Sequence, residues 1–407
     1  ILEDTLRCQR GNARNCMRRL TERQGRLEIR IIWRRVRTLI QDKGVCMVSK
    51  MKTDQKKKPS KTTEHVCRGR DGTDNPAGEK QPDLFCPVAK RCGGCQWIGM
   101  DYQRQLKEKE KRVRKILAPY CRLEGILGME QPLHYRNKIH AVFGENRKHQ
   151  PISGIYEERT HRIVPVDSCL IENRQADAII VTIRELLPSF KIRPYNEDTG
   201  YGLLRHVLIR VGQASGQILV VLVLASPILP SRNNFVKALL KRHPEITTIV
   251  TNVNYRSTSM VLGKGYIEDR LCGKTFRISP KSFYQVNPVQ TEVLYARALE
   301  YAALTGQETV VDAYCGIGTM GLIASDRARQ VIGVELNADA VRDARGNARI
   351  NQVENIRFYQ NDAGRFLMEM AASEARGSDG PAPRRQQRGI SGGSGAHVPV
   401  AGGVCVL

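Results

Sequence analysis

The chain has 407 residues, 41% of them hydrophobic, which is enough for two or three domains with apolar cores. Lysine and arginine total 65 against 41 aspartate and glutamate residues, and the net charge of +24 favours a polyanionic partner such as nucleic acid over a merely soluble basic protein. No run of about 18 apolar residues occurs and no signal-peptide pattern opens the chain, so we expect a cytoplasmic protein without a membrane span.

Residues 1–80 predict a basic, disordered arm. Residues 1–66 hold 18 basic and 7 acidic residues, and few large apolar side chains follow residue 50. Met47 and Met51 are the natural candidates for a start of translation. Residues 1–46 are therefore interpreted either as upstream sequence read through in a gene model or as an arm that helps to bind RNA.

Three cysteines within ten residues follow the arm, at Cys86, Cys92 and Cys95. The two glycines before Cys95 free the backbone to turn thiolates toward one another. Cys169 is the best candidate for a fourth ligand. Four thiolates suit either zinc or an iron–sulfur cluster, and the spacing favours iron–sulfur because structural zinc usually shows two paired C-x-x-C knuckles.

Residues 81–275 predict an α+β central domain that carries this iron–sulfur loop. Asp101 to Leu117 has the pattern of a charged amphipathic helix, and a basic-aromatic segment at 134–138 leads into a strand that is suited to contacting RNA. Apolar runs from residue 201 onward predict an antiparallel sheet. Arg205, His206 and Arg210 are expected on its solvated face.

A strand, a glycine-rich loop, a helix and a second strand are predicted over residues 309–337, which is the βαβ pattern of a parallel sheet. Gly316 and Gly318 let the backbone approach a ligand closely. Glu335, at the end of the second strand, is placed to accept hydrogen bonds from ribose hydroxyls. The loop matches the G-x-G-x-x-G pattern of NAD sites, but Asp312 would oppose a pyrophosphate and suits the cationic amino-acid part of S-adenosyl-L-methionine better.

A further strand near residue 360 ends at Asn361 and Asp362, and either side chain could contact the base of the cofactor. Residues 276–370 are thus predicted to form a partial cofactor-binding domain. Residues 371–407 lack periodicity and are rich in glycine, proline and arginine. They are expected to be an aberrant, disordered tail that follows a frameshift near Ala375 and cuts the fold off within the domain.

Five motifs occur in one order: C-x5-C-G-G-C-Q from Cys86, YRNK from Tyr135, GLLRHVLIR from Gly202, SFYQVNP from Ser282 and DAYCGIGT from Asp312. Together they resemble the RNA uracil-C5 methyltransferases, specifically the iron–sulfur members that modify 23S ribosomal RNA. The resemblance covers about residues 84–367. The tRNA branch of that family lacks the cysteine motif.

This resemblance implies an α/β fold with an incomplete class I, Rossmann-like S-adenosyl-L-methionine methyltransferase domain behind the α+β central domain. It implies that the four cysteines hold a 4Fe-4S cluster, that the partner is 23S ribosomal RNA and that no membrane is involved. We expect a monomer. The cofactor contacts that it implies, taken with those inferred from the residues themselves, are Gln285, Asp312, Tyr314, Gly316, Gly318, Thr319, Glu335, Asn361 and Asp362.

In the family, a cysteine in an S-C-N-P segment adds to C6 of uracil, C5 takes the methyl group, and a glutamate removes the C5 proton. Neither the S-C-N-P segment nor the D-P-P-R segment before it occurs in this sequence. No catalytic residue is assigned, and the chain as written is expected not to methylate. The alternatives are a non-catalytic RNA-binding iron–sulfur protein, a tRNA uracil-C5 methyltransferase, and a nicotinamide-dependent oxidoreductase.

Overall fold

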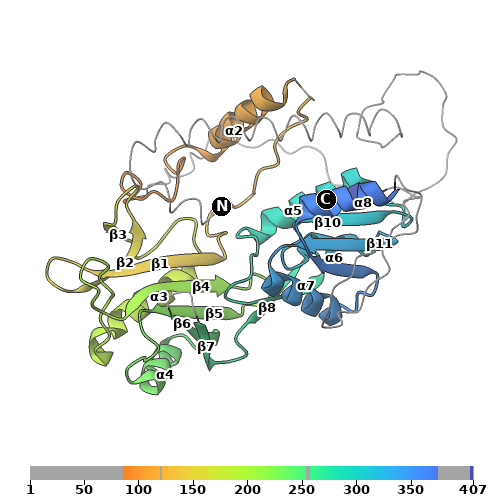
Figure 1. Ribbon diagram of the computed structural model, residues 1–407. Coiled ribbons are helices and arrows are strands. Elements are labelled where there is room, and N and C mark those ends of the chain that lie inside the picture. Colours follow the sequence, from red (N-terminus) through yellow and green to blue (C-terminus); the bar gives the residue numbers. More distant parts are fainter. Residues whose placement is uncertain (1–85, 120–121, 254–256, 375–403, 407) are drawn as a thin grey trace, which may run out of the picture. The chain divides into compact units, whose positions relative to one another are not determined.

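The structure, a computed structural model, describes residues 86–119, 122–253, 257–374 and 404–406 (Figure 1). The predicted arm of residues 1–80 lies outside these ranges. The described chain begins with the cysteine loop, which is followed by helix α2 (Tyr102–Leu117). Asp101 starts this helix by accepting a hydrogen bond from the Arg104 N–H at 3.0 Å. No helix in the described part of the chain is long and apolar enough to cross a membrane.

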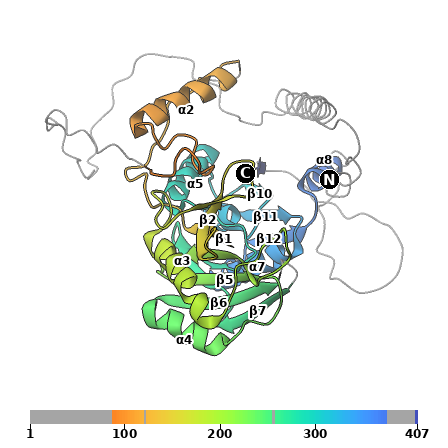
Figure 2. The same ribbon diagram turned by 90° about the vertical axis from the view of Figure 1, so that its left-hand side faces the viewer.

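A seven-stranded sheet forms the central part, in the order β3-β2-β1-β4-β5-β6-β7. Helices α3 (Arg174–Leu186) and α4 (Arg232–Arg242) pack on one of its faces, as Figures 1 and 2 show. A short 3-10 helix, η2 (Pro188–Phe190), follows α3. The strands are β1 (Lys138–Glu145), β2 (Pro151–Tyr156), β3 (Ile163–Pro165), β4 (Leu204–Val211), β5 (Ile218–Leu224), β6 (Ile246–Val253) and β7 (Ser257–Leu262).

Strand β5 is buried on both faces, which explains its unbroken apolar sequence ILVVLVL. The even-numbered residues from Ile218 to Leu224 belong to the core under α3 and α4. Leu219, Val221 and Val223 point the other way and join a second core. This core contains Val310 and Leu322 of the half that is predicted to bind the cofactor, residues 267–374 and 404–406 (the cofactor half). Adjacent side chains of a strand alternate between faces, so one strand serves both cores.

The predicted antiparallel sheet is correct except at one pair of strands. β5 and β6 run parallel, with Val220 opposite Ile249. Helix α4 makes the crossover between them, and such a connection is what parallel neighbours require. The apolar periodicity of the strands does not reveal the direction in which they pair.

The cofactor half contains a parallel four-stranded sheet in the order β12-β11-β10-β13. An antiparallel pair, β8 (Ile267–Leu271) and β9 (Lys274–Ile278), precedes it. The strands are β10 (Thr309–Ala313), β11 (Gln330–Glu335), β12 (Ile356–Gln360) and β13 (Val404–Val406). The helices are α5 (Pro288–Ala302), α6 (Thr319–Ala324), α7 (Ala338–Ile350) and α8 (Ala363–Glu374).

Two sequence-based boundaries differ from the structure. The strand predicted over 276–285 ends at Ile278, because Pro280 supplies no N–H and Ser279 turns the chain by donating its N–H to Ser282 Oγ at 2.9 Å. The predicted domain boundary at 275/276 therefore falls inside β9. The expected disordered tail also contributes structure, since residues 371–374 extend α8 and β13 pairs with β10.

Candidate functional site

The loop between β10 and α6 is a tight turn built on left-handed backbone conformations. Tyr314, Gly316 and Gly318 have φ of 66°, 56° and 81°. A Cβ at Gly318 would lie 2.8 Å from the ring of Phe358, so a larger residue does not fit there. Cys315, between them, is buried, and burial raises the pKa of its thiol. The turn thus places backbone N–H groups at the start of α6.

Asp312 stabilises the helix that follows this loop. It is buried, and its Oδ2 accepts a hydrogen bond from the Gly321 N–H at 2.8 Å. Burial, followed by the nearby charge of Glu335, raises its pKa to about 7. Its Oδ2 thus holds the backbone of α6, and a contact of this carboxylate with the cationic part of the cofactor stays a prediction.

Glu335, at the end of β11, lies over the loop as predicted. Its Oε2 accepts a hydrogen bond from the Gly316 N–H at 3.1 Å, and its Oε1 accepts one from the Asn337 N–H at 2.9 Å. The side chain is only half-buried. A carboxylate oxygen has a second lone pair, so the geometry leaves acceptor capacity for a hydroxyl pair.

The other predicted cofactor residues fall into two groups around this loop. The Tyr295 hydroxyl lies 3.2 Å from Thr319 Oγ1, and Gln285 lies near the same hydroxyl. Asn361 donates its backbone N–H to the Glu335 carbonyl at 3.1 Å. Asp362 instead accepts from the Arg365 N–H at 2.8 Å near the start of α8, a capping role.

Tyr314 is exposed, with 75% of its surface accessible. It projects from the loop at the carboxyl end of β10, where ligands of open α/β sheets bind. Glu335, bonded to Gly316, therefore lies with Tyr314 and Gly318 at the carboxyl edge of the sheet, and their role as cofactor contacts stays a prediction.

Asn347 is a residue of this site that the sequence analysis missed. It is fully buried on α7, donates from Nδ2 to the Ile317 carbonyl at 3.1 Å, and accepts at Oδ1 from the Arg277 N–H at 2.8 Å. It thus connects the cofactor loop to β9. The available signal was a polar residue on the apolar face of a predicted helix, between Ala344 and Ala348.

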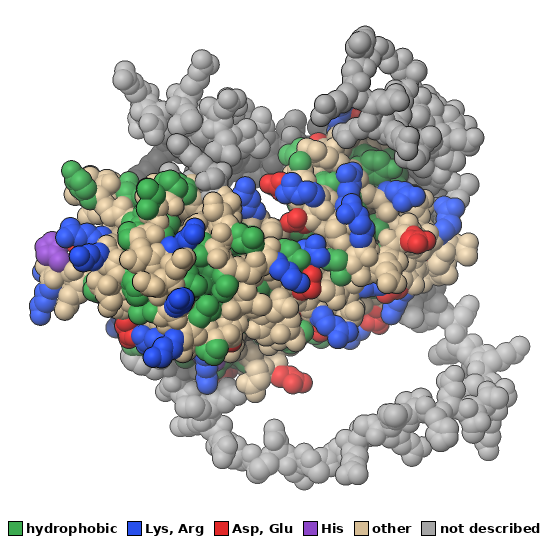
Figure 3. Space-filling view, turned by 90° about the horizontal axis from the view of Figure 1, so that it is seen from below, with side chains coloured by type: hydrophobic (Ala, Val, Ile, Leu, Met, Phe, Trp, Pro, Cys, Tyr) green, Lys and Arg blue, Asp and Glu red, His purple; other side chains and the backbone are tan. Residues whose placement is uncertain are grey.

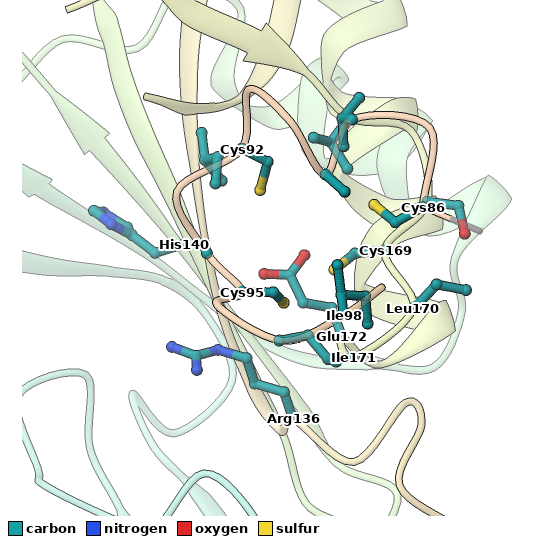
Figure 4. A pocket seen from close by; sticks show the side chains of 16 residues that line it. Cys86, Cys92, Cys95, Ile98, Arg136, His140, Cys169, Leu170, Ile171 and Glu172 are labelled. Atoms are coloured by element: carbon teal, nitrogen blue, oxygen red, sulfur yellow. The ribbon is translucent and has the colours of Figure 1, made fainter. Parts of the chain in front are cut away.

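The four cysteines predicted as metal ligands line one cavity of about 190 Å³, although Cys169 is distant from the others in sequence (Figure 4). Asp177 anchors Cys169 by accepting its backbone N–H at 2.8 Å. Arg136 and Glu172 also line the cavity. No three His, Cys, Asp or Glu side chains of the described residues are placed close enough together to hold a metal ion.

The cavity is electrostatically unfavourable for free thiolates. Burial, followed by the charge of Glu172, raises the pKa of Cys169 to about 11. Burial, followed by Cys92 and Cys86, raises the pKa of Cys95. Thiolates that disfavour one another's charge in this way are stabilised by a cationic centre between them. Four thiols around one cavity are the type of donor that structural zinc sites and iron–sulfur clusters both use.

The basic-aromatic segment at 134–138 joins the two halves of the described chain. Asn137 donates from Nδ2 to the Gln285 carbonyl at 3.1 Å and from its backbone N–H to the Val286 carbonyl at 2.9 Å. Arg210 was expected on a solvated face, but it is buried, with only 3% of its surface exposed. Its guanidinium donates a hydrogen bond to the Ser282 carbonyl. Burial lowers its pKa to about 10.

The sequence profile described as tRNA (uracil-5-)-methyltransferase matches residues 101–376, more than half of the chain. The chain belongs to this family. The matched range contains the whole glycine loop and Cys169, while Cys86, Cys92 and Cys95 precede it.

The chain is similar to other members at the level of sequence. It is 41% identical over 305 residues to an uncharacterized RNA methyltransferase of Halalkalibacterium halodurans, which covers 71% of this chain. It is 38% identical over 298 residues to an uncharacterized RNA methyltransferase of Caldanaerobacter subterraneus subsp. tengcongensis, which covers 70% of it. The chain spans 66% of the length of each of these relatives.

Among solved structures, the chain is similar to the Pyrococcus abyssi tRNA (uracil-54, C5)-methyltransferase in complex with S-adenosyl-L-homocysteine. The identity is 26%, the TM-score 0.54, and the alignment covers 66% of this chain and 64% of that one. The half of the chain that contains the parallel sheet thus has the class I methyltransferase fold. This confirms the fold class expected for the second half of the chain.

Proposed function

We propose that this protein serves the transfer of a methyl group from S-adenosyl-L-methionine to C5 of a uridine in 23S ribosomal RNA. The observation that carries the proposal is the convergence of Tyr314, Gly316, Gly318 and Glu335 at one sheet edge in a member of a uracil-5-methyltransferase family. The S-adenosyl-L-homocysteine complex of the Pyrococcus abyssi relative supports the same choice of cofactor.

Each residue of the loop has a role in this proposal. Glu335 would accept hydrogen bonds from the ribose hydroxyls. The backbone of 316–318 would lie against the ligand, because Gly316 and Gly318 have no side chain to keep the ligand away. Tyr314 covers the exposed side of the ligand. Gln285 and Thr319, which is bonded to Tyr295, would contact the ligand as well. When bound, the cofactor supplies an electrophilic methyl group.

The choice of ribosomal RNA over tRNA rests on the cysteine cavity, because the tRNA branch of the family lacks the cysteine motif. We assign Cys86, Cys92, Cys95 and Cys169 as ligands of a 4Fe-4S cluster. Anaerobic reconstitution followed by iron and sulfide analysis tests this assignment. Serine at any of the four positions should abolish iron retention, whereas Cys272→Ser, outside the cavity, should leave it unchanged.

Titration calorimetry with S-adenosyl-L-homocysteine and, separately, with NADH tests the binding site. Binding of the first ligand alone supports the proposal. Binding of NADH alone would favour an oxidoreductase and would end it.

A tRNA substrate is the second candidate, because the solved relative with bound S-adenosyl-L-homocysteine is a tRNA enzyme. Lys and Arg side chains are scattered over the face shown in Figure 3, with fewer Asp and Glu side chains, and such a charge attracts any RNA. Competition between a 23S ribosomal RNA fragment and tRNA at fixed salt separates the two. Preference for tRNA would favour the second candidate.

A further inference from the structure

A groove of about 520 Å³ lies next to the cysteine cavity, between the cysteine loop, helix α2 and the segment 126–136. This volume is within the range of about 300–1,000 Å³ that is typical of ligand sites. The cofactor contacts described above do not line it. We call it the Trp97 groove.

The lining of the Trp97 groove has the composition of a nucleobase site. Trp97, Tyr102 and Tyr135 supply aromatic rings, and Gln96, Gln105 and Gln290 supply amides. Lys109 and Arg136 are the charged residues among the described side chains that line it, and no carboxylate is among them. Aromatic faces stack on any base, while amides pair with base edges.

Helix α2 borders the groove and is strongly basic. Its 16 residues include seven lysines and arginines and two glutamates, and none of its residues is buried. Arg112 lies over the Trp97 ring at 4.8 Å and Lys109 at 6.0 Å. A neutral apolar ligand would not require this charge, whereas a phosphate backbone running along the helix would.

The walls of the groove are held in place. The Tyr102 hydroxyl accepts the Met129 N–H at 2.8 Å, and Gln290 Nε2 donates to the Leu127 carbonyl at 2.8 Å. Gln290 lies in the first turn of α5, five residues after Gln285 of the cofactor site. The groove therefore leads from the cysteine loop toward the cofactor half.

A larger groove of about 730 Å³ near Tyr201 is less suited to RNA. Three carboxylates line it, and two of its basic side chains lie beside carboxylates: Arg162 lies 2.8 Å from Glu157, and His161 3.5 Å from Glu197. Its exposed Tyr201 offers a matched aromatic control.

We propose that the Trp97 groove binds the unpaired RNA nucleotides that flank the target uridine. Trp97 and Tyr102 stack on the bases, and the lysines and arginines of α2 contact the phosphates. This deepens the proposed function, on which it rests for the nature of the substrate.

The test uses the full chain and a fluorescein-labelled single-stranded uridine-rich RNA of about 12 nucleotides, within the range of single-strand site sizes. Anisotropy measures affinity for the wild type, Trp97→Ala, Trp97→Phe and Lys109→Ala. Tyr201→Ala and Lys237→Ala on α4 are the controls. Trp33 and Trp97 are the two tryptophans of the chain, so a Trp33→Phe background makes RNA stacking on Trp97 visible as quenching.

Trp97→Ala should weaken binding about 5- to 100-fold, the effect of losing one stacked base, and Trp97→Phe should restore most of it. Lys109→Ala should lower the slope of log affinity against log salt by about one. The proposal would be overturned if Trp97→Ala bound the RNA as tightly as the wild type, or if RNA did not quench the Trp97 fluorescence. A loss of RNA affinity in Tyr201→Ala instead of Trp97→Ala would also overturn it, as would displacement of the RNA by a hydrophobic peptide but by no nucleic acid. S-adenosyl-L-homocysteine binding, measured on the same variants, reports separately on the proposed function and should not change.

Discussion

Asn347 provides a sharp test of how the cofactor loop is supported. Replacing it with leucine keeps the approximate volume of the side chain but removes its bonds to the Ile317 carbonyl and the Arg277 N–H. Asn347 is fully buried, so solvent does not replace these partners at its position. Each unsatisfied group costs about 1–3 kcal/mol, which gives a total loss of about 2–6 kcal/mol.

That loss is a large part of a typical stability of about 5–15 kcal/mol. Urea unfolding followed by circular dichroism measures it, with Arg342→Ala on the exposed side of the same helix as the control. The control removes a surface ion pair with Asp339, and its expected effect is below about 1 kcal/mol. A loss under about 1 kcal/mol for Asn347→Leu would refute the role given to this residue.

Three further predictions concern the same half. Gly333→Ala should destabilise the fold by about 1–3 kcal/mol, because its Cβ would lie 2.4 Å from the Phe358 ring. Gly346→Ala, with no atom within 4 Å of its Cβ, should stabilise α7 by about 1 kcal/mol. A raised unfolding temperature for Gly333→Ala, or a lowered one for Gly346→Ala, would contradict the respective prediction. The folded pKa of Asp312 is raised to about 7, above its unfolded value of about 3.9, so the folded state retains a proton that the unfolded state loses, and stability falls as pH rises between these values. Asp312→Asn should remove a slope of up to about 1.4 kcal/mol per pH unit from unfolding measured without cofactor, and an unchanged slope would exclude Asp312 as its source. Glu335→Ala should weaken S-adenosyl-L-homocysteine binding by about 1.5–3 kcal/mol and Glu335→Gln by less, and calorimetry showing no difference from the wild type would remove Glu335 from the site.

The glycine loop was predictable from the sequence because its information is local. The strand, glycine turn, helix and second strand lie within 29 residues. The positive φ at positions 316 and 318 favours glycine, and these glycines identify the turn in the sequence. The start of α5 is a local feature too, since Asn287 precedes Pro288 and caps the helix by accepting the Gln290 N–H at 3.1 Å. Such features depend on neighbours a few positions away.

Features that depend on distant partners were not predictable. Arg210 appears as one more charge in a strand, and its burial follows from a carbonyl 72 positions later in the chain. The tail strand β13 was missed because a three-residue strand gains its stability from pairing with β10, with Val310 opposite Cys405. The gathering of the cysteines around one cavity agrees with their predicted grouping, while their role as cluster ligands stays a prediction.

The two-sided burial of β5 has a consequence for attempts to dissect this protein. Leu219, Val221 and Val223 of the central sheet are part of the same hydrophobic core as residues of the cofactor half. A fragment starting at residue 276 would lack these side chains, along with the Asn137 amide that pairs with the Gln285 carbonyl. The cofactor half of this family member is therefore not expected to fold as a separate unit, and chimaeras that exchange it should carry β5 with it.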